Sequence, residues 1–239
     1  MNNINQLNEM ITCSKNIVFF GGAGVSTESG VKDFRSAEGI YSMNYKFPPE
    51  EVLSHSFYET HTEEFYDFYR IYLCFPDAKP NKAHYKLAEL EKSGKLKAII
   101  TQNVDGLHQN AGNKIVYELH GSALRNYCVR CGRFHGFNSV YLSKGIPRCE
   151  CGGIIKPDVV LYEESLNEET IKKSVNAISE ADMLIVAGTS LKVYPAAGFI
   201  RYFKGKYLVL INLDKTDADS EFALVIHDKV GEVLDKIEI

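Results

Sequence analysis

Short apolar runs alternate with helical patterns along this chain, and this alternation limits the folds open to it more than any other feature. The runs have the length of strands and cover residues 17–20, 96–100, 115–119, 183–187, 207–211 and 223–226. Helical patterns lie at 81–94 and 168–181, and Pro195 can open a further helix. Strands that are apolar throughout are typical of a sheet covered on both faces. We therefore predict an α/β fold, a Rossmann-like parallel sheet with helices on both faces.

Four of the six cysteines fall within 24 residues, in two close pairs: Cys128 with Cys131, and Cys149 with Cys151. This spacing can supply four thiolates from two turns to a tetrahedral zinc ion. Because the protein fills all four positions, the metal would be structural and would take no part in chemistry. The other two cysteines, Cys13 and Cys74, are interpreted as buried thiols.

Two stretches interrupt the alternation, an aromatic segment at 37–75 and the cysteine-bearing segment at 126–156. We predict that they form a small domain, made of a helical insert and a zinc-binding module. The Rossmann-like, nucleotide-binding domain then comprises residues 1–36, 76–125 and 157–239. A chain of 239 residues is long enough for one such core with an appended module.

The net charge of −4 and the pI near 6.0 provide no general attraction to nucleic acids or anionic membranes. Residues 1–16 are polar where a signal peptide has its apolar core, and no later apolar run approaches the length of a membrane span. We expect a cytoplasmic protein with no membrane partner and no specific nucleic-acid partner. The sequence carries no indication of an oligomeric state.

A glycine-rich turn directly follows the first predicted strand and contains Gly22, Ala23 and Gly24. Glycines there permit a tight turn and let backbone N–H groups approach a phosphate. The dinucleotide fingerprint is incomplete, since Thr27 stands in place of its third glycine, and a plain glycine turn explains the residues equally well. Shortly afterwards, Arg35 could hold a phosphate with two hydrogen bonds.

Polar residues also follow the other predicted strands. Gln102, Asn103 and Asp105 come after the strand at 96–100, and their amides and carboxylate suit ribose hydroxyls and a carboxamide. Taken alone, Asp105 is more simply the N-cap of the next helix. His120 follows the strand at 115–119, where a base and a satisfied core histidine are both possible and core is the simpler reading.

Two further polar sites follow strands, one at Gly188, Thr189 and Ser190 and the other at Asn212. One polar cluster at a strand end needs no special explanation. Four such clusters at one edge of a parallel sheet are what an extended dinucleotide requires. Together they indicate a dinucleotide site.

With these motifs in place, the sequence resembles the sirtuins, NAD-dependent protein-lysine deacylases, over nearly its whole length. The matching stretches follow the family's order: 22–26 (GAGVS), 29–30 (SG), 33–35 (DFR), 101–108 (TQNVDGLH), 120–121 (HG), the four cysteines, 188–191 (GTSL) and 195–197 (PAA). The resemblance implies that NAD is consumed with an acetyl-lysine protein to give nicotinamide, O-acetyl-ADP-ribose and lysine.

The resemblance also assigns roles. His120 would be the general base that activates a hydroxyl of the nicotinamide ribose, since a neutral imidazole can accept a proton near neutral pH. Asn103 would share the catalytic site and, with Gln102, hold that ribose. Val104 and Asp105 would hold the nicotinamide.

Further cofactor contacts follow from the same resemblance. Phe34 would shield the reactive carbon, and Asn212 would take the adenosine ribose. The phosphates would lie against Ala23, Thr27, Arg35 and Ser190. The rest of the implied cofactor set comprises Gly22, Gly24, Asp33, Gly188 and Thr189. The substrate peptide would pair as an added strand with Val159, Val160, Leu161 and Tyr162.

The chain departs from the family pattern at three places. Lys32 stands where the family usually has proline, and Glu163 stands where it usually has glycine. Sirtuins that remove acidic acyl groups share a Tyr-x-x-Arg pair, for which the best match here runs from Tyr66 to Tyr69, with Arg70 adjacent. A succinyl carboxylate would lack its cationic partner, so we expect a preference for acetyl or other uncharged acyl groups.

Two other functions would use the same residues. Ribose activation could deliver water or a protein side chain, making the chain an NAD glycohydrolase or an ADP-ribosyltransferase. A non-catalytic module that binds NAD or acyl-lysine is a third possibility, against which an intact His120 argues.

Overall fold

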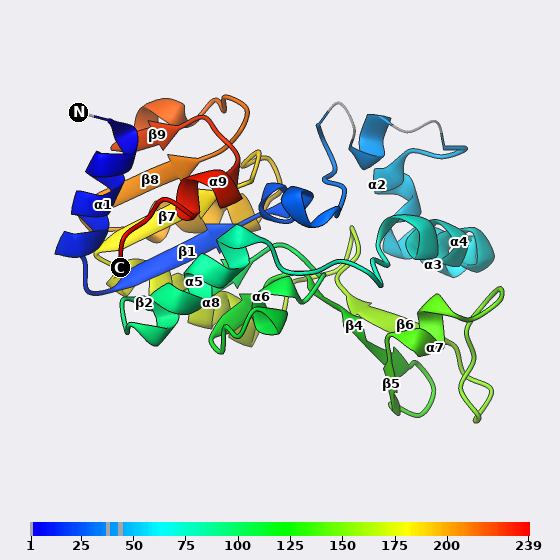
Figure 1. Ribbon diagram of the computed structural model, residues 1–239. Helices are drawn as coiled ribbons and strands as arrows, with labels where there is room; N and C mark the ends of the chain where they lie inside the picture. The colour runs from blue at the N-terminus through cyan, green and yellow to red at the C-terminus, as the bar shows by residue number, and fades with distance from the viewer. Residues whose placement is uncertain (1, 37–38, 43–44) are drawn as a thin grey trace.

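The computed structural model describes residues 2–36, 39–42 and 45–239 (Figure 1). Its larger part is a six-stranded sheet in the order β3-β2-β1-β7-β8-β9, with every neighbouring pair parallel. The strands are β1 (Ile17–Gly21), β2 (Leu96–Thr101), β3 (Val116–Glu118), β7 (Met183–Ala187), β8 (Tyr207–Ile211) and β9 (Leu224–Ile226). The predicted parallel α/β sheet is confirmed.

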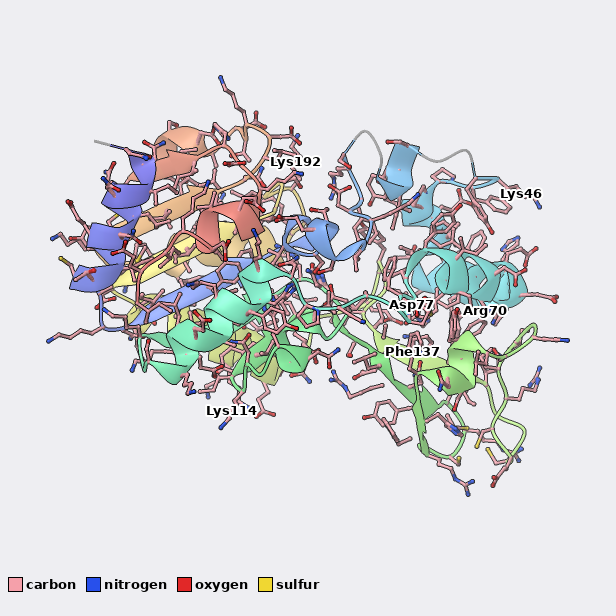
Figure 2. The ribbon with its side chains drawn as sticks, in the orientation of Figure 1. Lys46, Arg70, Asp77, Lys114, Phe137 and Lys192 are labelled. Atoms are coloured by element: carbon pink, nitrogen blue, oxygen red, sulfur yellow. The ribbon has the colours of Figure 1, made fainter. Side chains whose placement is uncertain are left out.

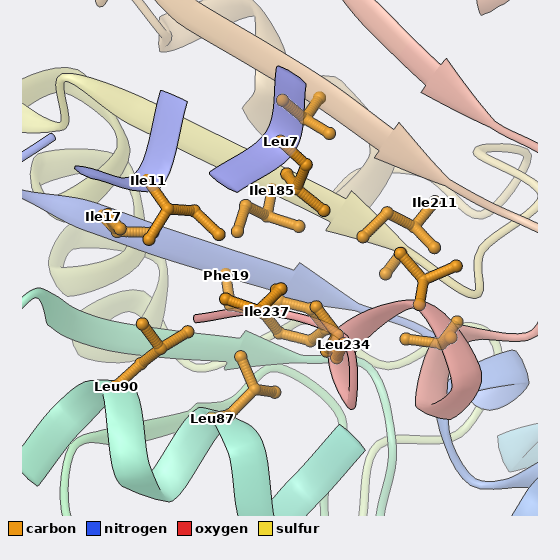
Figure 3. Packing of buried hydrophobic residues seen from close by; sticks show 14 of the residues in the cluster. Leu7, Ile11, Ile17, Phe19, Leu87, Leu90, Ile185, Ile211, Leu234 and Ile237 are labelled. Carbon is orange, nitrogen blue, oxygen red and sulfur yellow. The ribbon is translucent and has the colours of Figure 1, made fainter. Parts of the chain in front are cut away.

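Both faces of this sheet are covered, which explains why the central strands β1 and β7 are buried along their whole length. Successive side chains point to opposite faces, so Phe19 lies in one core and Phe20 in the other. The helices α1 (Asn3–Cys13), α5 (Lys82–Lys92) and α9 (Val230–Leu234) pack on the Phe19 side (Figure 3). The helix α8 (Glu168–Glu180) and the 3-10 helix η4 (Ala196–Tyr202) pack on the other side.

Local sequence determines where the long helices begin. The Asn81 side chain accepts a hydrogen bond from the Ala83 amide, and the Asn81 amide donates to Nδ1 of His84, which starts α5. The side chain of Asn167 caps α8 by accepting from the Thr170 amide at 2.9 Å. Both helices therefore start at the positions that their sequences indicate.

The smaller part of the molecule stands beside the sheet (Figure 1). It contains α2 (Pro49–Val52), α3 (His55–Thr60), α4 (Thr62–Tyr72) and α7 (Asn138–Tyr141), with an antiparallel sheet ordered β5-β4-β6. Its strands are β4 (Gly121–Cys128), β5 (Phe134–Gly136) and β6 (Ile155–Val159). Short elements complete the chain: α6 (Leu107–Asn110), η1 (Ala23–Val25), η2 (Thr27–Ser29), η3 (Ile40–Ser42) and η5 (Asp219–Glu221).

The helical insert and the cysteine-bearing module share one hydrophobic core. The Tyr66 hydroxyl donates to the Ile155 carbonyl at 2.7 Å, which ties α4 to β6. Arg70 lies at the same junction and donates to the Gly145 carbonyl at 2.9 Å (Figure 2). The exact domain bounds given above stay a prediction.

Two sequence-based interpretations need correction. Cys13 is exposed at the end of α1, whereas Cys74 is buried as expected. The helix opened by Pro195 is a 3-10 helix instead of an α-helix, and the Tyr194–Pro195 peptide bond is cis. Among the described residues no helix has the length and apolar character needed to cross a membrane.

Candidate active site

A cavity of about 290 Å³ lies between the carboxyl edge of the large sheet and the small domain. The parallel register aligns Gly21 at the end of β1 with Thr101 of β2 and Ala187 of β7. The polar segments that follow these strands therefore meet at one edge, as expected. The cavity is lined by these predicted cofactor or substrate residues: Gly22, Ala23, Gly24, Asp33, Phe34, Arg35, Gln102, Asn103, Val104, Asp105, His120, Val159, Val160, Leu161, Tyr162, Gly188, Thr189 and Ser190.

The glycines after β1 are needed because two backbone turns approach each other closely. A Cβ atom on Gly22 would lie 2.7 Å from the Gly188 carbonyl oxygen, and one on Gly24 would lie 2.7 Å from the Gly188 Cα. The Gly24 amide also donates to the Gly188 carbonyl at 2.9 Å. The turn after β1 is therefore packed against the turn after β7, and the backbones of both line the cavity.

Ser26 joins two cavity residues through its fully buried hydroxyl. Its Oγ donates to the Asp105 carboxylate at 2.7 Å and accepts from the Asn103 Nδ2 at 3.1 Å. The Asp105 carboxylate also accepts from the Leu107 amide at 2.9 Å, but the N-cap of α6 is Gly106, so the interpretation of Asp105 as the N-cap is wrong by one position. Burial raises the pKa of Asp105. Asp105 therefore lines the cavity with a carboxylate that is held by one hydrogen bond to each oxygen.

His120 lines the cavity just after β3. Its Nδ1 lies 2.9 Å from the Gln102 carbonyl oxygen. A carbonyl can only accept, so this contact fixes the proton of the neutral ring on Nδ1 and leaves Nε2 as an acceptor. Burial lowers the pKa of His120 and favours the neutral ring, although the bond to Gln102 acts in the opposite direction. The arrangement is suited to a general base.

Gly121 permits the sharp turn from His120 into β4. Its φ is +76°, and a Cβ there would collide with the Asp158 carbonyl oxygen. The Val160 amide donates to the His120 carbonyl at 3.0 Å. The turn therefore holds the proposed base directly beside the proposed peptide strip.

The segment that contains Asp33, Phe34 and Arg35 is held near the cavity by aromatic contacts. The Arg35 guanidinium lies 5.2 Å from the centre of the Tyr41 ring, and the Phe34 ring meets Tyr41 edge to face. The Tyr41 hydroxyl lies 3.0 Å from that of Tyr162. The Asp33 carboxylate accepts from the Ser36 hydroxyl at 2.6 Å, which closes the turn locally.

Two predicted cofactor residues lie outside the cavity lining. Thr27 is exposed and donates to the Gly24 carbonyl at 3.1 Å. Asn212 follows β8 at the same edge of the sheet, and its Nδ2 donates to the Asp214 carbonyl at 2.7 Å. Their contacts with a cofactor stay predictions.

The four cysteines of the module come together in space. Their sulfur atoms all lie within 4.8 Å of one another, with Cys128 Sγ 3.4 Å from Cys151 Sγ and Cys131 Sγ 3.8 Å from Cys149 Sγ. Zinc–sulfur bonds of about 2.3 Å in a tetrahedron place sulfur atoms roughly 3.8 Å apart. The donor set therefore fits a structural zinc ion, as the spacing predicted.

Several cavity residues were missed in the sequence. Tyr72, Leu73 and Phe75 line it from the end of α4, and Val193 and Tyr194 line it from the loop before η4. They carry no chemical motif, so only their position shows their place at the site. Ser26, which holds Asn103 and Asp105, could have been found from the sequence because it belongs to the glycine-rich motif.

Comparison with known proteins identifies the family. The family model described as the Sir2 family matches residues 22–195, most of the chain. The chain belongs to the Sir2 family. The sirtuin resemblance is confirmed.

Relatives of this Sir2 chain match it over nearly its whole length. An NAD-dependent protein deacetylase of Clostridium perfringens is 60% identical over 238 residues, covering 98% of both chains. A protein of the same name from Cutibacterium acnes is 52% identical and covers 98% of this chain and 96% of its own.

Solved Sir2 structures share the same fold. A Sir2 variant with a deacetylated p53 peptide and 3'-O-acetyl ADP-ribose has a TM-score of 0.89 at 37% identity, covering 98% of this chain and 96% of that one. Sir2 with a p53 peptide and NAD+ has a TM-score of 0.84 at 38% identity, covering 97% and 95%.

Proposed function

We propose that this Sir2 chain is an NAD-dependent protein-lysine deacetylase in which His120 is the general base. It converts NAD, an acetyl-lysine protein and water to nicotinamide, O-acetyl-ADP-ribose and lysine. The observation that carries the role of His120 is its Nδ1 contact with the Gln102 carbonyl, which leaves Nε2 as a proton acceptor in a cavity-lining ring.

NAD would supply an electrophilic ribose carbon, which the acyl oxygen attacks as the bond to nicotinamide breaks, and a ribose hydroxyl would finally carry the acyl group, so the chemistry needs no hydride transfer. The chain holds NAD through the turns at Gly22–Gly24 and Gly188–Ser190, where the glycines Gly22, Gly24 and Gly188 leave the backbone open to phosphates. The amides of Gln102 and Asn103 suit the ribose hydroxyls beside His120. Asp105, fixed by Ser26, suits the nicotinamide carboxamide.

The acyl-lysine segment binds along residues 159–162. Sir2 structures with p53 peptides support this class of partner. The amide of Tyr162 donates to the Leu53 carbonyl and its carbonyl accepts from the His55 amide, which fixes the strip against the helical insert. Backbone pairing with such a strip would tolerate many peptide sequences. A cytoplasmic location belongs to the same proposal, because a reducing compartment keeps the four cysteines available as thiolate ligands. Cell fractionation tests this location.

The test is incubation of the protein with NAD, with and without an acetyl-lysine peptide. We expect nicotinamide release and peptide deacetylation to depend on each other and to fall together in His120→Ala, while NAD binding persists. Nicotinamide release without peptide would favour a glycohydrolase instead. NAD binding with no turnover in the unmodified protein would favour a binding module.

A further inference from the structure

Glu163 has a backbone conformation that is uncommon for a residue with a side chain. Its φ is +75°, in the left-handed region that favours glycine. The Glu163 carboxylate accepts from the Ser56 amide at 2.9 Å and from the Ser56 hydroxyl at 3.0 Å. These two contacts with the first turn of α3 hold the side chain in one place despite the unfavourable backbone.

That place is the rim of the proposed peptide site. Glu163 directly follows Tyr162, lines the cavity and is exposed. The Ser54–Tyr162 bridge anchors the same short segment to the helical insert. A peptide that pairs with residues 159–162 would therefore pass within reach of the Glu163 carboxylate.

The charge of Glu163 is not neutralised by its contacts. The neighbouring Glu164 has two basic partners, with Lys156 Nζ at 3.2 Å and His55 Nδ1 at 2.9 Å. Ser56, in contrast, is neutral, and within residues 2–36, 39–42 and 45–239 Glu163 forms no ion pair. Glu59, on α3, is also paired, with its carboxylate 3.3 Å from His55 Nε2. The rim therefore keeps a fixed negative charge.

We propose that Glu163 is a specificity residue that favours acyl-lysine segments with lysine or arginine next to the modified residue. The inference rests on the proposed deacetylase function. An acetyl-lysine side chain has no charge, so only its neighbours can respond to the carboxylate. Oppositely charged groups several ångströms apart in a solvated rim attract modestly, and salt weakens the attraction.

The experiment compares three acetyl-lysine peptides that differ only in flanking residues: arginine, glutamine or glutamate. The ratio of kcat/KM values is the readout, so a general change in activity cancels. We expect the unmodified protein to prefer the arginine peptide over the glutamate peptide by about fivefold at low salt. The preference should shrink in about 0.5 M salt, because the Debye length is then only a few ångströms and the attraction between the two charges is screened.

Glu163→Gln keeps a side-chain oxygen for Ser56 but removes the charge, and it should bring the ratio close to one. Glu163→Gly also removes the charge and suits the left-handed backbone, so it covers the case in which the glutamine variant folds poorly. Glu221→Gln, at an exposed glutamate between β8 and β9, is the control and should keep the preference.

An unchanged ratio in both Glu163 variants would overturn the assignment of specificity while leaving the deacetylase function in place. A preference for the glutamate peptide in the unmodified protein would also overturn it. Absence of turnover with all three peptides would instead remove the proposed function and this inference with it.

Discussion

The Nδ1 atom of His120 lies 2.9 Å from the carbonyl oxygen of Gln102. The segment that follows β2 therefore orients the histidine that follows the neighbouring strand β3. The contact sets which nitrogen carries the proton, and burial lowers the pKa of the ring. The base is therefore neutral at lower pH than a free imidazole.

This predicts the pH dependence of activity. A base works when it is unprotonated. The apparent pKa of the acid limb in the pH profile of kcat/KM should therefore lie below the ordinary imidazole value of about 6.5. His120→Ala should reduce turnover by roughly 10²–10⁴-fold and abolish that limb. A pH series of deacetylation rates, with NAD binding followed by calorimetry, checks both. An acid limb that persists in His120→Ala would assign it to another group.

The buried Ser26 hydroxyl predicts a second outcome, because it links Asn103 to Asp105. Ser26→Ala removes one hydrogen-bond partner from the Asp105 carboxylate and one from the Asn103 amide. The loss should lower the free energy of unfolding by about 1–3 kcal/mol. We expect a higher KM for NAD and a lower free energy of unfolding. Ser29→Ala is a matched control, since the buried Ser29 hydroxyl has no hydrogen-bond partner among the described residues. Equal effects of the two substitutions would remove the role given to Ser26.

Zinc removal should unfold the module and not act on chemistry directly. Cys131→Ser removes one zinc ligand, and a strong chelator removes the ion that joins the two cysteine pairs. In both cases the small domain should lose structure, and deacetylase activity should fall as a consequence. Thermal unfolding monitored by circular dichroism, with zinc content by mass spectrometry, checks this. Cys13→Ser changes an exposed thiol outside the cluster and should leave the zinc content unchanged. Full stability of the zinc-free protein would contradict a structural role.

The acyl preference can be tested with matched acetyl and succinyl peptides. The Arg70 guanidinium contacts Ser143, Gly145 and Asp67, and neither Tyr66 nor Tyr69 lines the cavity. These contacts keep the adjacent arginine away from a succinyl carboxylate, so the acetyl peptide should be turned over faster, by tenfold or more if about 1.4 kcal/mol of charge-assisted bonding is missing. A faster succinyl reaction would overturn this expectation.

Two buried histidines predict loss of stability in acid. The rings of His84 and His108 lie 4.7 Å apart, and burial lowers both pKa values, that of His84 to about 4. An unfolded histidine takes up its proton near pH 6.5, before the folded one does, so stability should fall as the pH falls from about 6.5 to about 4. For His84 alone this is up to about 3 kcal/mol.

Urea unfolding at pH 7.5 and pH 5 measures the effect. His108→Leu should lose less stability between these two pH values than the unmodified protein, whereas His61→Leu, at an exposed histidine, should behave like the unmodified protein. Identical pH slopes in all three proteins would contradict the role of the buried pair.

The sequence by itself determined the fold class, the four-cysteine cluster and the family. Continuous apolar runs such as 183–187 have one physical explanation, burial on both faces, and paired cysteines have a ligand geometry that spacing largely fixes. It could not separate the cap and cavity readings of Asp105, or the base and core readings of His120, because each residue type serves both purposes.

Only the tertiary structure decided what those side chains touch. It gave His120 its tautomer through Gln102, turned Arg70 toward the zinc module, and placed Tyr72 and Leu73 in the cavity. It also showed Glu163 in a conformation that glycine would favour, held there by Ser56. Such contacts depend on where distant segments pack, and hydrophobic periodicity specifies which face is buried without specifying its neighbours.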